Sequence, residues 1–206
     1  MLRKFAPPKS YRKLLDWGCG SGHMSIMFQH VGYKVSSFDI NMDKGTKDIF
    51  TRFNIPYSVG GNKLPFKKEA FDIVTSIGVL EHVPNDTYSL GEIHRILRPG
   101  GIFFVANLPN KYSMSEFAAR RLGIWHHDRL YNRKSILKLF KKDKWEILLV
   151  KHSHIIPTNA LKINFKYLNA LYNKHYGVFL NADKKLERIP LINYLSNEWI
   201  VIARKI

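Results

Sequence analysis

Residues 14–23 read Leu14-Leu15-Asp16-Trp17-Gly18-Cys19-Gly20-Ser21-Gly22-His23, an apolar run followed by a turn with glycine at every second position. Glycine has no Cβ, so it tolerates positive φ and lets the backbone come close to a ligand. A dinucleotide-binding turn has the pattern Gly-x-Gly-x-x-Gly, whereas here the third glycine comes one residue early and an acid precedes the turn. The stretch therefore predicts a strand, a ligand-binding turn and a helix, and it argues against a nicotinamide dinucleotide.

A second acid supports this interpretation. Asp39 ends the run Val35-Ser36-Ser37-Phe38-Asp39, 21 residues after Gly18. A carboxylate at the end of the second strand can accept both hydroxyls of a ribose. Turn and acid together predict an adenosine-containing ligand at the carboxyl ends of the strands, and the alternative is a tight turn with a surface aspartate.

The rest of the chain alternates between short apolar runs and helix-compatible stretches. Strands are expected at Lys13–Trp17, Lys34–Phe38, Phe71–Ile77, Ile102–Ala106, Trp145–Val150 and Glu198–Ala203. A helix is expected from Asp86 to Leu97, stopped by Pro99-Gly100-Gly101. Such alternation predicts an α/β fold, a doubly wound and mostly parallel sheet with helices on both faces.

Length and composition limit the class of protein. A chain of 206 residues with 45% hydrophobic content is expected to form a single domain, residues 1–206. No apolar run is long enough to span a bilayer, the start lacks a signal-peptide core, and Cys19 is the only cysteine, so we expect a cytoplasmic protein without disulfides.

The charge is strongly basic, with 33 Lys and Arg against 16 Asp and Glu and a formal net charge of +17. Such a field favours nucleic acid, anionic lipid or acidic substrates. The basic residues are spread from Arg3 to Lys205, so a generally solvated basic surface remains an equal alternative.

Four stretches resemble the class I S-adenosylmethionine-dependent methyltransferases, particularly the small-molecule branch (methyltransferase type 11) that includes quinone-biosynthesis enzymes. They are residues 14–22, residues 38–41, residues 64–66 with 71–74 and 79–83, and residues 97–101. The resemblance covers roughly residues 12–107 and implies a Rossmann-like, seven-stranded fold with S-adenosyl-L-methionine as cofactor. It says little about the methyl acceptor.

The resemblance also implies cofactor-binding residues. The turn would lie along the methionine part, Asp39 on the ribose and Ile40 against the adenine. The full set is Asp16, Gly18, Cys19, Gly20, Ser21, Gly22, His23, Asp39, Ile40, Asn41, Gly61, Asn62 and Ile77. Many relatives carry an acid before the Leu64-Pro65-Phe66 stretch, and here Asn62 would have to replace it through its side-chain oxygen.

The acceptor is expected beneath segments 107–132 and 152–197, because few residues precede the first strand. The first segment holds the densest group of proton acceptors and rings, so His126 or His127 is the expected base and His82 a weaker candidate. Substrate contacts are expected from Asn107, Trp125, Asp128 and Tyr131. No metal is expected, because two adjacent histidines seldom both reach one ion.

The second segment carries an amphipathic pattern, with Leu161, Phe165, Leu168 and Leu171 or Tyr172 at helical spacing. Such a helix could lie on an anionic membrane, although packing on the sheet is favoured. The sequence thus predicts a methyltransferase acting on a small-molecule or lipid-like acceptor, with oxygen favoured as the target atom. A methyltransferase for RNA or another polyanion, and a non-catalytic cofactor-binding protein, remain as alternatives.

Overall fold

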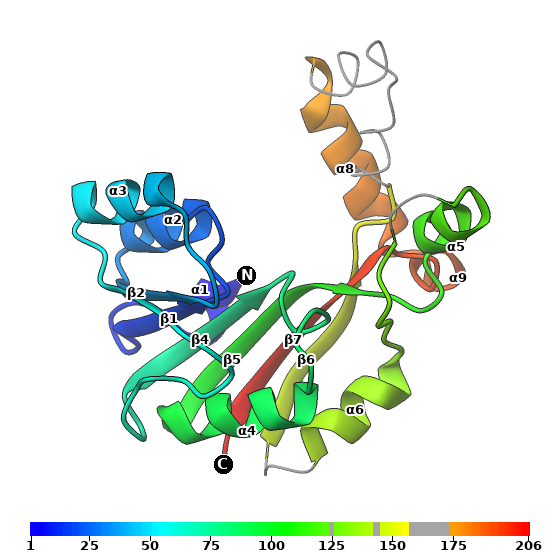
Figure 1. Ribbon diagram of the computed structural model, residues 1–206. Helices are drawn as coiled ribbons and strands as arrows, with labels where there is room; N and C mark the ends of the chain where they lie inside the picture. Colours follow the sequence, from blue (N-terminus) through cyan, green and yellow to red (C-terminus); the bar gives the residue numbers. More distant parts are fainter. Residues whose placement is uncertain (124–125, 142–144, 157–173) are drawn as a thin grey trace.

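The computed structural model describes residues 1–123, 126–141, 145–156 and 174–206. Its centre is a seven-stranded sheet with the order β3-β2-β1-β4-β5-β7-β6 (Figure 1). The strands are β1 (Lys13–Trp17), β2 (Lys34–Asp39), β3 (Tyr57–Val59), β4 (Phe71–Ile77), β5 (Leu97–Pro109), β6 (Trp145–Ser153) and β7 (Glu198–Lys205). Neighbouring strands pair in parallel from β3 to β5, and β7 is antiparallel to β5 and β6. The predicted doubly wound, mostly parallel sheet is confirmed.

Helices cover both faces of this sheet. α1 (Leu2–Phe5), α2 (His23–Val31) and α3 (Lys44–Arg52) contribute to one core, and α4 (Asp86–Ile96) and α6 (Arg133–Lys141) to the other. α5 (Met114–Arg121), α8 (Tyr176–Leu186) and α9 (Pro190–Asn193) gather beyond the ends of β5, β7 and β6 (Figure 1). Helices α5, α8 and α9 therefore lie on the side of the α/β sheet where the acceptor is predicted.

The two cores follow from the alternation of side chains along buried strands. Leu15 and Phe103 face the core beneath α4 and α6, whereas Leu14 and Phe104 face the opposite core. Helix α4 contributes Leu90, Ile93 and Ile96, all buried, and its first turn is capped by Asn85. Both faces of the sheet are apolar because helices cover both.

Strand β5 is longer than the sequence predicts. Leu97 pairs with Phe71 as the first residue of β5 rather than ending the helix, and a bulge absorbs residues 98–101 before Ile102 pairs with Ile73. The strand also continues beyond its predicted end at Ala106, because Leu108 and Pro109 pair with β7 and the irregularity is a bulge after Val105. Pairing with a neighbouring strand overrides the local turn pattern in both places.

One strand of the sheet was not predicted, and one predicted segment lies outside the described residues. Strand β3 was not among the predicted strands. The amphipathic pattern at residues 161–172 lies outside the described residues. Within the described part of the chain, no helix is long and apolar enough to cross a membrane.

Candidate functional site

The glycine turn is fixed between β1 and β2 at the carboxyl edge of the sheet. Gly18, Gly20 and Gly22 all have positive φ, at 73°, 50° and 80°. The amides of Gly18 and Cys19 donate to the Phe38 carbonyl at 2.8 and 3.1 Å, which binds the turn to β2. Left-handed backbone at three alternate positions explains why glycine is required there.

The three glycines of the turn differ in the space around them. A Cβ on Gly18 would lie 2.3 Å from Val79 Cγ2, and one on Gly22 would lie 2.7 Å from Phe50 Cε1. A Cβ on Gly20 would meet no atom within 4 Å. Gly18 and Gly22 are therefore required by packing within the protein, whereas Gly20 borders open space into which a ligand can come close.

Asp39 stands beside that open space. Its carboxylate accepts hydrogen bonds from the amide of Gly20 at 2.8 Å and of Asn41 at 3.3 Å. The next side chain, Ile40, is 71% exposed, and Val59 on the neighbouring strand β3 is 46% exposed. A carboxylate flanked by exposed apolar side chains fits a ribose attached to a flat ring. Gly61 and Asn62, the other predicted cofactor residues after β3, are exposed.

Asp16 is buried, only 2% exposed, beneath the turn. Its carboxylate accepts hydrogen bonds from the Ser25 hydroxyl at 2.6 Å and the Thr75 hydroxyl at 2.9 Å, and these bonds connect β1 to α2 and β4. Burial raises the pKa of Asp16, although both hydroxyls oppose this. Its position beside the methionine part of the cofactor stays a prediction.

The other predicted cofactor residues of the turn and of β4 lie in different environments. Cys19 is buried, and burial raises the pKa of its thiol to about 12, so the thiol is neutral and a poor nucleophile. The exposed Ser21 hydroxyl lies 2.6 Å from Nδ1 of His23. Ile77 ends β4 and is followed by Gly78, another residue with positive φ.

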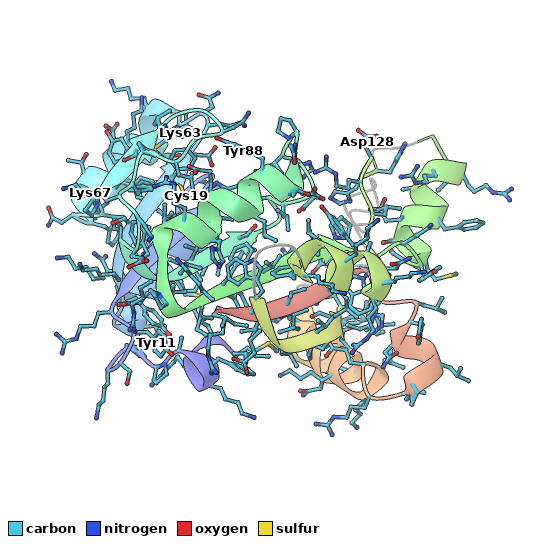
Figure 2. All side chains as sticks on the ribbon, turned by 90° about the horizontal axis from the view of Figure 1, so that it is seen from below. Tyr11, Cys19, Lys63, Lys67, Tyr88 and Asp128 are labelled. Carbon is cyan, nitrogen blue, oxygen red and sulfur yellow. The ribbon has the colours of Figure 1, made fainter. Side chains whose placement is uncertain are left out.

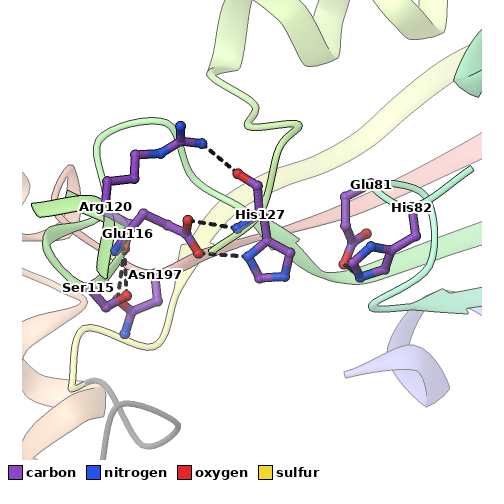
Figure 3. Close-up of polar contacts among 8 residues, drawn as sticks. Glu81, His82, Ser115, Glu116, Arg120, His127 and Asn197 are labelled. Atoms are coloured by element: carbon purple, nitrogen blue, oxygen red, sulfur yellow. Dashed lines mark hydrogen bonds and ion pairs between the residues drawn. The ribbon is translucent and has the colours of Figure 1, made fainter. Parts of the chain in front are cut away.

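A second polar group lies beyond the ends of β4 and β5. His127 Nδ1 is 2.6 Å from Glu116 Oε1, the His127 amide donates to Glu116 Oε2 at 3.1 Å, and Arg120 donates to the His127 carbonyl (Figure 3). The hydrogen bond to Glu116 raises the pKa of His127. Burial alone would raise the pKa of Glu116, but the bonds from His127 outweigh it and lower that pKa. The two shifts agree, and both indicate a charge-assisted pair.

Glu81 and His82 lie on the other side of the His127 ring (Figure 3). The ring centroids of His82 and His127 are 5.5 Å apart, and His82 Nε2 lies 3.7 Å from Glu81 Oε1. Glu81 is buried, its Oε2 has no hydrogen-bond partner within the described residues, and burial raises its pKa to about 7. Burial lowers the pKa of His82, whose side chain is 54% exposed.

In the part of the chain that the structure describes, Glu81, His82 and His127 form a group that could hold a metal ion. Glu81, His82 and His127 each offer one ligand atom, and the three atoms lie within 4.8 Å of one another. The sequence argued against a metal on the ground that His126 and His127 are adjacent. The structure instead brings His127 to His82, a pairing that the spacing of residues along the chain does not reveal.

The other predicted acceptor residues fall in different environments. Asn107 is exposed, with φ of 56°, at the bulge beside Gly78. Asp128 is exposed and lies well apart from Cys19 of the glycine turn (Figure 2). Tyr131 is buried in the core, with its hydroxyl 3.2 Å from Asp86 Oδ2, and burial raises its pKa. His126 is partly exposed, and Trp125 lies outside the described residues.

Residues 1–152 match the family of methyltransferase domains. The chain belongs to this family. A ubiquinone biosynthesis O-methyltransferase from Pelagibacter ubique is 27% identical over 186 residues, covering 82% of this chain and 74% of that protein. One from Paramagnetospirillum magneticum is 34% identical over 103 residues, covering 46% of this chain and 40% of that protein.

Solved structures agree on the fold. The S-adenosylmethionine-dependent methyltransferase of Mesorhizobium loti has a TM-score of 0.65 at 16% identity, covering 98% of this chain and 95% of the other. The cyclase SpnF has the same TM-score at 18% identity, covering 99% and 79%. Family and fold together make the protein an S-adenosylmethionine-dependent methyltransferase with a Rossmann-like sheet, as predicted.

Three carboxyl groups near His127 were not among the predicted candidates. Glu116 follows Ser113 by three residues, and the Ser113 hydroxyl accepts from the Glu116 amide at 3.2 Å, so its sequence signal is that of a helix start. Glu81 precedes His82 and was visible only as part of that pair. Glu198 opens β7, is partly buried with Oε2 unpartnered within the described residues, and has a pKa raised by burial. Burial of a carboxyl is not visible in the sequence.

Proposed function

We propose that this methyltransferase methylates a hydroxyl oxygen of a small-molecule or lipid-like acceptor, with His127 as the proton acceptor and Glu116 as its positioning partner. The observation that carries the proposal is the 2.6 Å contact between His127 Nδ1 and Glu116 Oε1 at the carboxyl edge of the sheet. The names of the O-methyltransferase relatives support oxygen as the target atom.

The chemistry needs such a pair. S-adenosylmethionine supplies an electrophilic methyl group on a sulfonium, and a neutral thioether leaves, so the protein must orient the acceptor and remove its proton. With Nδ1 engaged by Glu116, proton exchange with an acceptor falls to Nε2 of His127. The Glu116 carboxylate fixes the ring and stabilises the imidazolium that forms, as its raising of the His127 pKa indicates.

Cofactor and acceptor sites are assigned to different parts of the chain. Gly20, Asp39 and Ile40 would contact the cofactor, because they border the open space of the turn. Segments 107–132 and 152–197 would supply the acceptor side, since α5 and the loop after it already bring Glu116 and His127 beyond β4 and β5.

The proposal is tested by labelled methyl transfer from S-adenosylmethionine into lipid, small-molecule and RNA fractions, followed by kinetics on the acceptor identified. His127→Ala should reduce turnover on a hydroxyl acceptor by about 10²- to 10⁴-fold and leave the affinity for S-adenosylhomocysteine unchanged. His126→Ala is the matched variant, because the histidines are adjacent. Full turnover of His127→Ala, or a loss confined to His126→Ala, would overturn the assignment, and saturable methylation of an RNA would overturn the acceptor class.

A further inference from the structure

A cavity of about 640 Å³ lies at the outer edge of the sheet, remote from the glycine turn. Its walls come from the start of α6, the second half of β6, the end of α8, and α9. Three strands separate β6 from β1 in the sheet, which at ~4.8 Å per strand places the cavity roughly 19 Å from the strand that carries the turn. Its volume is that of a small-molecule site.

This cavity is called here the β6 pocket. Its lining is mostly basic where it is charged. Four cations line it, namely Arg133, Lys151, Lys184 and Arg188, and Glu187 is the only carboxylate among the lining residues. Glu187 Oε2 already binds Lys151 Nζ at 2.8 Å. Within the described residues no carboxylate pairs with the other three cations, so four positive charges against one negative leave three uncompensated.

Aromatic rings also line the β6 pocket, and hydrogen bonds hold two of them in place. The rings of His152 and Trp199 stack with centroids 3.8 Å apart, and Tyr194 lies 5.4 Å from His152. The Trp199 indole N–H donates to Asn110 Oδ1 at 3.2 Å and to the Tyr131 carbonyl at 3.1 Å, which fixes it. His152 Nδ1 lies 2.8 Å from the Ser196 hydroxyl. Tyr194 also lines the cavity and remains exposed.

We propose that the β6 pocket binds a small phosphorylated ligand that carries a planar ring, of the class of nucleoside diphosphates. Arg133, Lys184 and Arg188 take the phosphates, because guanidinium and ammonium groups from α6, from α8 and from the turn after α8 can surround a polyanion. Tyr194 stacks on the ring. A hollow of this size favours one small ligand over an RNA strand, which needs an extended basic groove.

The test is calorimetry with guanosine diphosphate, pyrophosphate and guanosine, with the cofactor site saturated by S-adenosylhomocysteine. Guanosine diphosphate should bind most tightly, pyrophosphate more weakly and guanosine weakest. The triple variant Arg133→Gln, Lys184→Gln, Arg188→Gln should lose at least tenfold in affinity for the diphosphate. Tyr194→Ala should weaken the diphosphate and leave pyrophosphate unchanged, and Tyr194→Phe should retain both.

A second triple variant controls for net charge: Lys34→Gln, Lys67→Gln, Lys138→Gln. All three lysines are exposed, and Lys67 lies on the opposite side of the molecule from α8 and α9 (Figure 2). This variant should bind the diphosphate as the unchanged protein does. Equal weakening in both triples would mean a general field effect and overturn the proposal. So would the absence of diphosphate binding, or tighter binding of a single-stranded RNA that the first triple does not weaken. Retained binding of S-adenosylhomocysteine shows that each variant is folded.

Discussion

Gly18→Ala should destabilise the protein more than Gly20→Ala, although both glycines belong to one turn and both have positive φ. Each alanine would be held in the left-handed region, which costs about 1 to 2 kcal/mol. Only the Gly18 methyl group would also enter a packed site, since its Cβ would lie 2.3 and 2.6 Å from the two methyl carbons of Val79.

The magnitude follows from these two contributions. Overpacking of this kind costs about 1 to 3 kcal/mol, so Gly18→Ala should lose about 2 to 5 kcal/mol in the free energy of unfolding and Gly20→Ala only about 1 to 2. For a domain of this size 1 kcal/mol corresponds to about 2 to 4 °C in Tm. The entropy that alanine removes from the unfolded chain is common to both variants and cancels in the comparison.

The assay is urea unfolding of both variants and of a double-mutant cycle with Val79→Ala. Removing the Val79 methyl groups should relieve the clash and recover about 1 to 3 kcal/mol of the Gly18→Ala loss, with no such coupling for Gly20→Ala. Calorimetry should show the opposite order for the cofactor: Gly20→Ala loses at least tenfold in affinity for S-adenosylhomocysteine while remaining folded. Equal losses of stability with no coupling to Val79 would refute the division of roles among the glycines.

Other changes have equally direct expectations. Asp39→Ala should weaken both S-adenosylmethionine and S-adenosylhomocysteine by about 1.5 to 3 kcal/mol in calorimetry, because the ribose hydroxyls lose a charge-assisted partner, and unchanged affinity would exclude that contact. Turnover should rise with pH, with a midpoint above the ordinary histidine pKa, because His127 must be neutral to accept a proton and Glu116 raises its pKa. Glu116→Gln should move the midpoint of the pH–rate profile to lower pH, and an unmoved midpoint would show that another group titrates. Asn110→Ala should cost about 1 to 3 kcal/mol in urea unfolding, because the buried amide donates at 2.8 Å to the carbonyls of Tyr194 and Ser196; an unchanged midpoint would mean that water replaces it.

Local patterns predicted most of the sheet because buried strands are marked by continuous apolar runs. The expected bounds of β1 and β4 coincide with the observed Lys13–Trp17 and Phe71–Ile77. Strand β3 was not predicted, because its three residues, Tyr57–Val59, are too few to show the alternation of apolar and polar residues typical of a strand. The predicted ends of β5 were wrong. Bulges at both ends extend its pairing with β4 and β7 through residues that favour turns in isolation.

The approach of the glycine turn to Asp39 was also predictable from the sequence, because the two stand at the carboxyl ends of neighbouring parallel strands. The grouping of side chains around His127 was not. His127 was a candidate, but its partner Glu116 lies 11 residues earlier on α5 and shows only the pattern of a helix start. The proximity of Glu81 and His82 to His127 depends on how the segment after β5 folds back over β4.

A shared fold does not settle the reaction, since the cyclase SpnF and a methyltransferase from Mesorhizobium loti superpose on this chain equally well. The fold is what these proteins have in common. The groups that could decide the acceptor chemistry, Glu116 and His127, come from the segment after β5, and Glu198 opens β7 on the same side. If the proposed function is right, variants of Glu116 and His127, unlike variants of the turn, should change turnover on the acceptor without changing the affinity for the cofactor.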